Sequence, residues 1–224
     1  CNDSSDPIVD GPSIAKHVTI NSDSESLTAR VTRDNTGVMA LIDPELPTGR
    51  LLEVASNLPL IMVSQVEAPV SDGKTLKATH VDIDGDYAYV SYNTEGDTYL
   101  GAVDIFDITN IYSPVITEQA IFTDADISSL EYKNGKLYLA AAVNIDINTD
   151  VTSPANLITV SVAGGKFISD FVYTSLPSYV ATDVANTNSN TAVTSGNDVV
   201  IGLFDDSQKS KSSTQMVDLR AVAF

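Results

Sequence analysis

The chain has 224 residues, 43% of them hydrophobic, and a formal net charge of −18. This apolar content excludes a disordered chain, and no stretch reaches the roughly 18 to 20 unbroken apolar residues of a membrane-spanning helix. Nucleic acid is not expected as a partner, because binding its phosphate backbone needs clustered basic residues, and the one basic cluster is Lys209 and Lys211.

The only cysteine is residue 1, so an intrachain disulfide is impossible. Bacterial lipoproteins are cleaved directly before a cysteine that then carries lipid, and the alternative is a sequence that begins at Cys1 by chance. The segment 1–13 is polar, acidic and interrupted by two prolines, as in a flexible tether. We expect Cys1 to be lipidated, with the lipid as the only membrane contact. Asp3 and Asp6 resemble the export signal of surface lipoproteins in some Gram-negative bacteria, which predicts the outer-membrane surface.

The segment 14–77 is the least regular part of the chain. Four stretches have strand-like apolar patterns, and they predict an irregular first sheet: His17–Ile20, Leu27–Val31, Val38–Ile42 and Leu60–Val66. The stretch Leu41–Asn57 could instead contain a short helix.

Three hairpins repeat along the rest of the chain, at residues 80–92, 129–142 and 191–203. The first two align without a gap, so that Val81 matches Leu130 and Ile83 matches Tyr132. Each hairpin has a turn that contains glycine between two apolar strands, which is a strong hairpin signal: Asp84-Gly85-Asp86, Lys133-Asn134-Gly135 and Ser195-Gly196-Asn197.

A third strand is predicted after each hairpin, at Leu100–Ile108, Asn156–Val162 and Gln215–Val222. A fourth follows in two copies, within residues 114–123 and at Lys166–Thr174. Four strands in about 50 residues are typical of a β-propeller blade. The expected fold is therefore all-β, with antiparallel four-stranded blades in one domain, 14–224. It comprises the irregular first blade at 14–77 and repeats at 78–124, 125–179 and 180–224.

The segment 85–114 resembles the LVIVD repeat of bacterial β-propeller lipoproteins. The matching motifs are Ala102-Val103-Asp104-Ile105 and Asp107-Ile108-Thr109-Asn110, followed by Pro114. The match is good over this blade, fair over 129–175 and loose elsewhere. The resemblance implies propeller architecture and brings no catalytic residues. The third repeat lacks a fourth strand before Phe224, so we expect an incomplete propeller of three to four blades, with residues missing after Phe224. The alternative is that the N-terminal strand closes a four-bladed ring.

The loop NIDINTD resembles the first half of a calcium loop, because Asn144, Asp146, Asn148 and Asp150 alternate along it. It lacks the glycine and the final glutamate of that pattern. The alternative is a polar loop in which Asn and Asp form turns, and we expect no ordered calcium. Asp82, Asp84 and Asp86 alternate in a similar way, but we interpret them as residues of the hairpin turn and its outward-facing positions and not as a calcium site.

Four tyrosines, Tyr87, Tyr89, Tyr92 and Tyr99, lie in one repeat. They predict either cross-strand packing or an aromatic binding surface for sugars or a protein. His17 and His80 have no companions at zinc-ligand spacing, although His80 precedes a strand at a blade edge.

No hydrolase elbow, phosphate-binding loop or dinucleotide motif occurs in the sequence. The sequence therefore favours a non-catalytic envelope lipoprotein that binds an outer-membrane or other envelope protein and needs no cofactor. The alternative is a glycan-binding or glycan-degrading surface lipoprotein that serves nutrient uptake.

Overall fold

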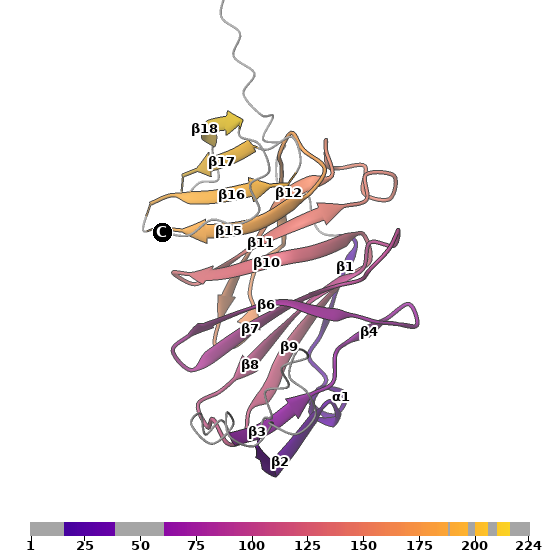
Figure 1. Ribbon diagram of the computed structural model, residues 1–224, viewed down its shortest axis with the longest axis vertical. Helices are drawn as coiled ribbons and strands as arrows, with labels where there is room; N and C mark the ends of the chain where they lie inside the picture. Colours follow the sequence, from indigo (N-terminus) through magenta and orange to yellow (C-terminus); the bar gives the residue numbers. More distant parts are fainter. Residues whose placement is uncertain (1–15, 39–60, 188, 197–199, 206–209, 216–224) are drawn as a thin grey trace, which may run out of the picture.

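The structure is a computed structural model that describes residues 16–38, 61–187, 189–196, 200–205 and 210–215 (Figure 1). It is an all-β molecule, as the sequence predicts. Three antiparallel sheets are stacked one on another along the longest axis (Figure 1). The tether 1–13 and the stretch Leu41–Asn57 lie outside the described residues.

The first sheet has five strands in the order β1-β9-β8-β7-β6. Four of them are the predicted hairpin with its third and fourth strands, and the prediction is confirmed. The fifth, β1, comes from the N-terminal segment and pairs with β9, Val18 opposite Phe122. The strands are β1 (Val18–Asn21), β6 (Lys77–Asp84), β7 (Tyr87–Asn93), β8 (Gly101–Asp107) and β9 (Val115–Phe122).

The second sheet repeats this arrangement with β10, β11 and β12, as predicted. The single strand expected at Lys166–Thr174 is wrong, because two short strands, β13 and β14, pair with opposite ends of β12. The strands are β10 (Ala125–Lys133), β11 (Lys136–Val143), β12 (Ala155–Ala163), β13 (Lys166–Phe167) and β14 (Val172–Ser175).

The third sheet has four strands in the order β15-β16-β17-β18. The predicted hairpin at 191–203 exists as β16 and β17, but it is the second and third strand of its sheet. The expected lack of a fourth strand is wrong, because the sequence analysis missed β15. Of the strand predicted at Gln215–Val222, only Gln215 lies within the described residues, where it ends the strand β18. The strands are β15 (Ala181–Asn186), β16 (Thr191–Ser195), β17 (Val200–Phe204) and β18 (Ser210–Gln215).

The described part of 14–77 does not form the four-stranded sheet that was expected. The strand predicted at Leu27–Val31 is wrong, because the helix α1 (Ser24–Ala29) occupies most of it. Its N-cap is Asp23, whose carboxylate accepts hydrogen bonds from two backbone amides, Glu25 N and Ser26 N. The remaining strands form two-stranded pairs: β2 (Val31–Val38) with β3 (Ile61–Val66), and β4 (Val70–Ser71) with β5 (Lys74–Thr75).

The first strand of each sheet in the repeats, β6, β10 or β15, carries a β-bulge at the same place. The register shifts at Thr79 in β6, at Ser128 in β10 and at Thr182 in β15. A bulge re-aims the side chains that follow it, so its position fixes which residues of the three sheets are equivalent. We refer to β6, β10 and β15 as the first strands.

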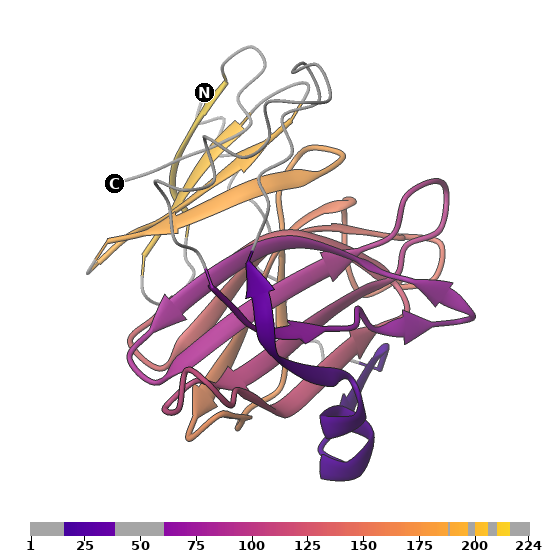
Figure 2. The same cartoon turned by 60° about the horizontal axis from the view of Figure 1, so that its bottom comes forward.

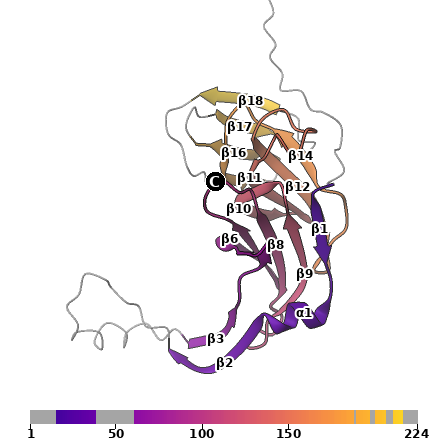
Figure 3. The ribbon, with the colours of Figure 1, turned by 90° about the vertical axis from the view of Figure 1, so that its right-hand side faces the viewer.

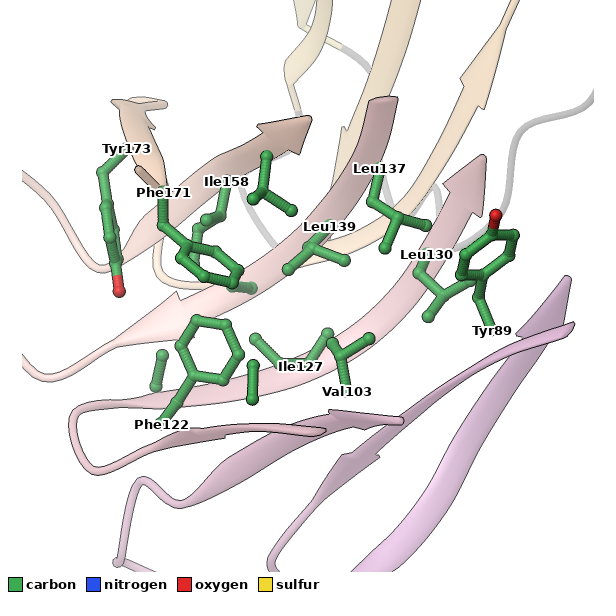
Figure 4. Packing of buried hydrophobic residues seen from close by; sticks show 14 of the residues in the cluster. Tyr89, Val103, Phe122, Ile127, Leu130, Leu137, Leu139, Ile158, Phe171 and Tyr173 are labelled. Carbon is green, nitrogen blue, oxygen red and sulfur yellow. The ribbon is translucent and has the colours of Figure 1, made fainter. Parts of the chain in front are cut away.

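Apolar side chains fill the space between the sheets. The main core lies between the first and second sheets, where Phe122 of the first sheet meets Phe171 of the second repeat, in one cluster with Ile127 and Leu139 of the second sheet (Figure 4). A second cluster joins the second and third sheets through Leu157 and Val184. On the other side of the first sheet, Leu27 of α1 packs against Ala88, Phe106 and Ile116. Figure 2 shows α1 at one end of the stack and the third sheet at the other.

Candidate functional site

The position after the bulge holds His80 in β6, Ser129 in β10 and Asp183 in β15, and these three side chains are hydrogen-bonded in a row. The Ser129 hydroxyl donates to Asp183 Oδ1 at 2.6 Å and lies 3.1 Å from His80 Nδ1. The same ring nitrogen lies 2.7 Å from the carbonyl oxygen of Leu130. We call this row of equivalent residues the ladder. It connects the first strands of all three sheets.

A second row runs parallel to the ladder. The carboxylate of Asp82 accepts a 2.7 Å hydrogen bond from the backbone amide of Tyr132, and Glu131 accepts one of 3.1 Å from the Asn186 amide group. The Thr79 hydroxyl donates to the carbonyl oxygen of Ile127 at 2.8 Å. Side chains of β6 thus hydrogen-bond to backbone groups at the edge of β10, which protects that edge from pairing with another chain.

The ladder has the composition of a hydrolase triad, but its order of hydrogen bonds is different. In a triad, histidine lies between the serine and the acid, so that it can take the serine proton. Here Ser129 lies between His80 and Asp183, and its hydroxyl donates to the carboxylate. Ser129 is also buried. The ladder therefore does not have the arrangement of a triad, and its hydrogen bonds join the first strands of the three sheets.

The four tyrosines do not form one aromatic surface. Tyr89 and Tyr92 are buried, which corrects the binding-surface interpretation for these two, while Tyr87 and Tyr99 are half-buried. The Tyr89 ring stacks on Tyr132 of the second sheet, and Tyr92 belongs to a small cluster with Leu76 and Leu100. Packing is therefore the role of Tyr89 and Tyr92.

The NIDINTD loop uses its polar side chains in separate local hydrogen bonds. The side-chain oxygen of Asn144 accepts from the amide of Asp146, and that of Asn148 accepts from the amide of Asp150. Asp150 also pairs with Lys16 at 3.3 Å. Within the described ranges, no group of three or more His, Cys, Asp or Glu side chains is arranged to hold a metal ion.

Asn148 is buried and donates a 2.7 Å hydrogen bond to Asp124, which is fully buried at the start of the second sheet. The other Asp124 oxygen has no hydrogen-bond partner in the described structure, and neither has the Tyr173 hydroxyl. Burial raises the pKa of Asp124, while the Asn148 hydrogen bond and the nearby His17 act in the opposite direction. Asp124 therefore anchors the loop at an electrostatic cost.

A buried ion pair fixes the N-terminal segment to the first sheet. The Arg30 guanidinium makes two hydrogen bonds to the Asp104 carboxylate, at 3.1 and 2.6 Å, and Asp104 also accepts one of 2.7 Å from Gln119. The Asp104 side chain is fully buried, and burial followed by the charge of Asp104 raises the pKa of the neighbouring Tyr92. Sequence reasoning quoted Asp104 only as part of a motif and gave Arg30 no role.

The remaining predicted residues are placed as follows. Cys1 lies outside the described residues. The His17 carbonyl oxygen accepts a 3.0 Å hydrogen bond from the amide of Thr123, which fixes the start of β1. His80 is exposed, and its Nδ1 atom is hydrogen-bonded in the ladder. Within the described ranges, no helix is long and apolar enough to cross a membrane.

Compared with known proteins, the chain matches no protein-family model and no curated protein sequence.

Proposed function

We propose that this protein is a non-catalytic, lipid-anchored interaction module of the bacterial cell envelope, built from β-propeller-type blades. The observation that carries the proposal is the ladder. Its histidine, serine and aspartate are hydrogen-bonded to one another between the sheets, which supports a scaffold role over a reaction centre. Such a scaffold acts by presenting surfaces to a partner.

Three further features support the location and the blade architecture. The lone cysteine at residue 1 is followed by a polar, proline-containing segment suited to a tether. The equivalent bulges define three repeats, each with a four-stranded antiparallel unit. The LVIVD resemblance implies the same architecture. We expect the partner to be an outer-membrane or other envelope protein.

The glycan-binding alternative relied on a stacking surface of four tyrosines. Two of them, Tyr89 and Tyr92, are in the core and cannot stack on a sugar. No other observation on the described residues favours it.

The test is fractionation and cross-linking of cells that export the protein. Wild type should be in the outer-membrane fraction and should form cross-links to an integral envelope protein. Cys1→Ser should move to the soluble fraction, while Ser5→Ala, in the same tether, should behave as wild type. Membrane association of Cys1→Ser would contradict the anchor. The absence of any cross-linked envelope protein in wild-type cells would contradict the interaction role.

A further inference from the structure

The first strand of the first sheet is uncovered where its equivalents are buried. Val81 in β6 occupies the same position as Leu130 in β10 and Val184 in β15, because each is the second residue after the bulge of its strand. The cross-strand partners are equivalent as well: Val81 pairs with Val90, Leu130 with Leu139 and Val184 with Val193. Val81 is 54% exposed, whereas Leu130 is 0% and Val184 4% exposed.

The next residue on the same face shows the same contrast. Ile83 is equivalent to Tyr132, whose ring is stacked beneath Tyr89 of the first sheet with a centroid distance of 4.8 Å. Ile83 is 62% exposed. In the second and third sheets, therefore, this part of the first strand is packed against the preceding sheet. In the first sheet it carries two large apolar side chains in water, which is unusual for adjacent positions on one face of a strand.

The rest of this face of the first sheet is covered. Val90 and Ala88, opposite Val81 and Ile83, belong to the cluster that packs against Leu27 of α1. Val31 of β2 and Val66 of β3 complete that cluster. In the part of the chain that the structure describes, this cluster includes no side chain of β6, so the exposed apolar surface is about one strand wide.

The backbone of β6 is also open on this side. Within the described residues, β6 is the end strand of the first sheet and pairs only with β7. Figure 3 shows β6 next to β10 of the second sheet. Asp84 and Tyr87 flank a two-residue turn, so the alternation of an antiparallel pair points the backbone groups of Val81 and Ile83 away from β7. The Ile83 amide is held by its own neighbour, Asp82 Oδ1, at 2.9 Å. Among the described residues, no hydrogen bond to the carbonyl oxygen of Val81 or Ile83 is found.

We propose that the exposed face and edge of β6, centred on Val81 and Ile83, bind an extended, basic segment of a partner protein. This inference rests on the proposed interaction function and identifies its surface. Apolar side chains of the segment cover Val81 and Ile83, as the first sheet covers their equivalents in the second. Basic side chains on the segment face Asp84 and Asp86, which are exposed at the end of β6.

A second copy of the chain fits this surface poorly. Each copy carries a formal charge of −18, so two copies repel each other. A second copy that packed one of its sheets here would also need the full face of the first sheet. The part of that face over β7 to β9 is already covered by α1, β2 and β3. An extended segment needs only the width of one strand.

The probe is a synthetic eight-residue peptide of alternating Lys and Val, titrated into the whole protein and monitored by fluorescence anisotropy. A Lys-Ser peptide of equal charge is the control for non-specific attraction. The protein variant is Val81→Ser with Ile83→Ser. The matched control variant is Ile168→Ser with Tyr179→Ser, which removes two other exposed apolar side chains. All four substitutions are on the surface, and unfolding curves verify that the fold is kept.

We expect the Lys-Val peptide to bind wild type and the control variant equally, and to bind the Val81/Ile83 variant at least about tenfold more weakly, as for the loss of two apolar contacts. The Lys-Ser peptide should bind wild type as weakly as the Lys-Val peptide binds the Val81/Ile83 variant. Equal binding of Lys-Val to both variants, or no binding to wild type, would overturn the inference. Envelope cross-links that persist in the Val81/Ile83 variant would reject this surface alone and leave the interaction function intact.

Discussion

The rings of Tyr89 and Tyr132 lie nearly parallel, 9° apart, with 4.8 Å between their centroids. Tyr89 belongs to the first sheet and Tyr132 to the second, and Tyr89 is among the largest fully buried side chains of the described core. The pair is a direct aromatic contact between two repeats. It shows that the tyrosine pattern of this repeat serves packing at that position.

Replacing Tyr89 by alanine should lower the free energy of unfolding by about 3 to 5 kcal/mol, because a large buried ring leaves a cavity between the sheets. Urea denaturation measures this value. Tyr112→Ala is the matched control, since Tyr112 is 69% exposed, and it should change stability by less than about 0.5 kcal/mol. Equal effects of the two substitutions would show that the contact between the first two sheets is wrongly placed.

The Arg30–Asp104 pair gives a second prediction. Arg30→Met leaves the fully buried Asp104 carboxylate without its cation and should destabilise the protein by about 3 kcal/mol, because a buried charge is left uncompensated. The double variant Arg30→Met, Asp104→Leu should recover part of this loss, since the charge is removed as well. A double variant less stable than Arg30→Met in the same denaturation assay would contradict this explanation.

Asp124 predicts a dependence of stability on pH. Because burial raises the pKa of Asp124 above 3.8, the folded protein binds this proton more tightly than the unfolded chain does. The stability contributed by the group is present below pH 3.8 and is lost as pH rises through the folded pKa. Asp124→Asn should therefore unfold at higher denaturant than wild type at neutral pH, and the difference should shrink as the pH falls.

Asp146→Asn provides the control for this experiment, because Asp146 lies exposed in the loop that Asp124 anchors. Its unfolding free energy should follow the wild-type pH profile. If Asp124→Asn lowers stability at neutral pH, the Asn148 hydrogen bond needs the charged carboxylate, and the cost of burying that charge has been overestimated.

The strands of the first two repeats could be predicted because their signals are local. Alternating apolar residues flank turns with Gly85 and Gly135, both at positive φ, where glycine is favoured. The strand β15 was missed because its apolar residues are mostly small, and because the turn that follows it, 187–190, contains no glycine. The hairpin predicted around Gly196 exists as β16 and β17, but it is the second and third strand of its sheet and not the first and second.

The helix α1 has a signal that could have been read, since Asp23 precedes Glu25 and Ser26 in an N-cap pattern. The ladder has none. Its hydrogen bonds join residues 49 and 54 positions apart, and they exist because each first strand has a bulge directly before the residue concerned. Neither the bulge nor the stacking of sheets is visible in a local pattern. The same limit applies to the Arg30–Asp104 pair.

His80, Ser129 and Asp183 are equivalent residues of a ladder that holds three sheets together. Ser129→Ala tests it most directly, because the Ser129 hydroxyl contacts both other members. The matched control is Ser128→Ala, the bulge residue next to it, which is not part of the ladder.

The measurement is the free energy of unfolding of the two variants against wild type, by urea denaturation at neutral pH. Ser129→Ala should be less stable by about 1.5 to 3 kcal/mol, because it removes a buried hydrogen bond to a carboxylate. Ser128→Ala should be within about 0.5 kcal/mol of wild type. Equal stabilities of Ser129→Ala and wild type would contradict the ladder as the connection between the sheets.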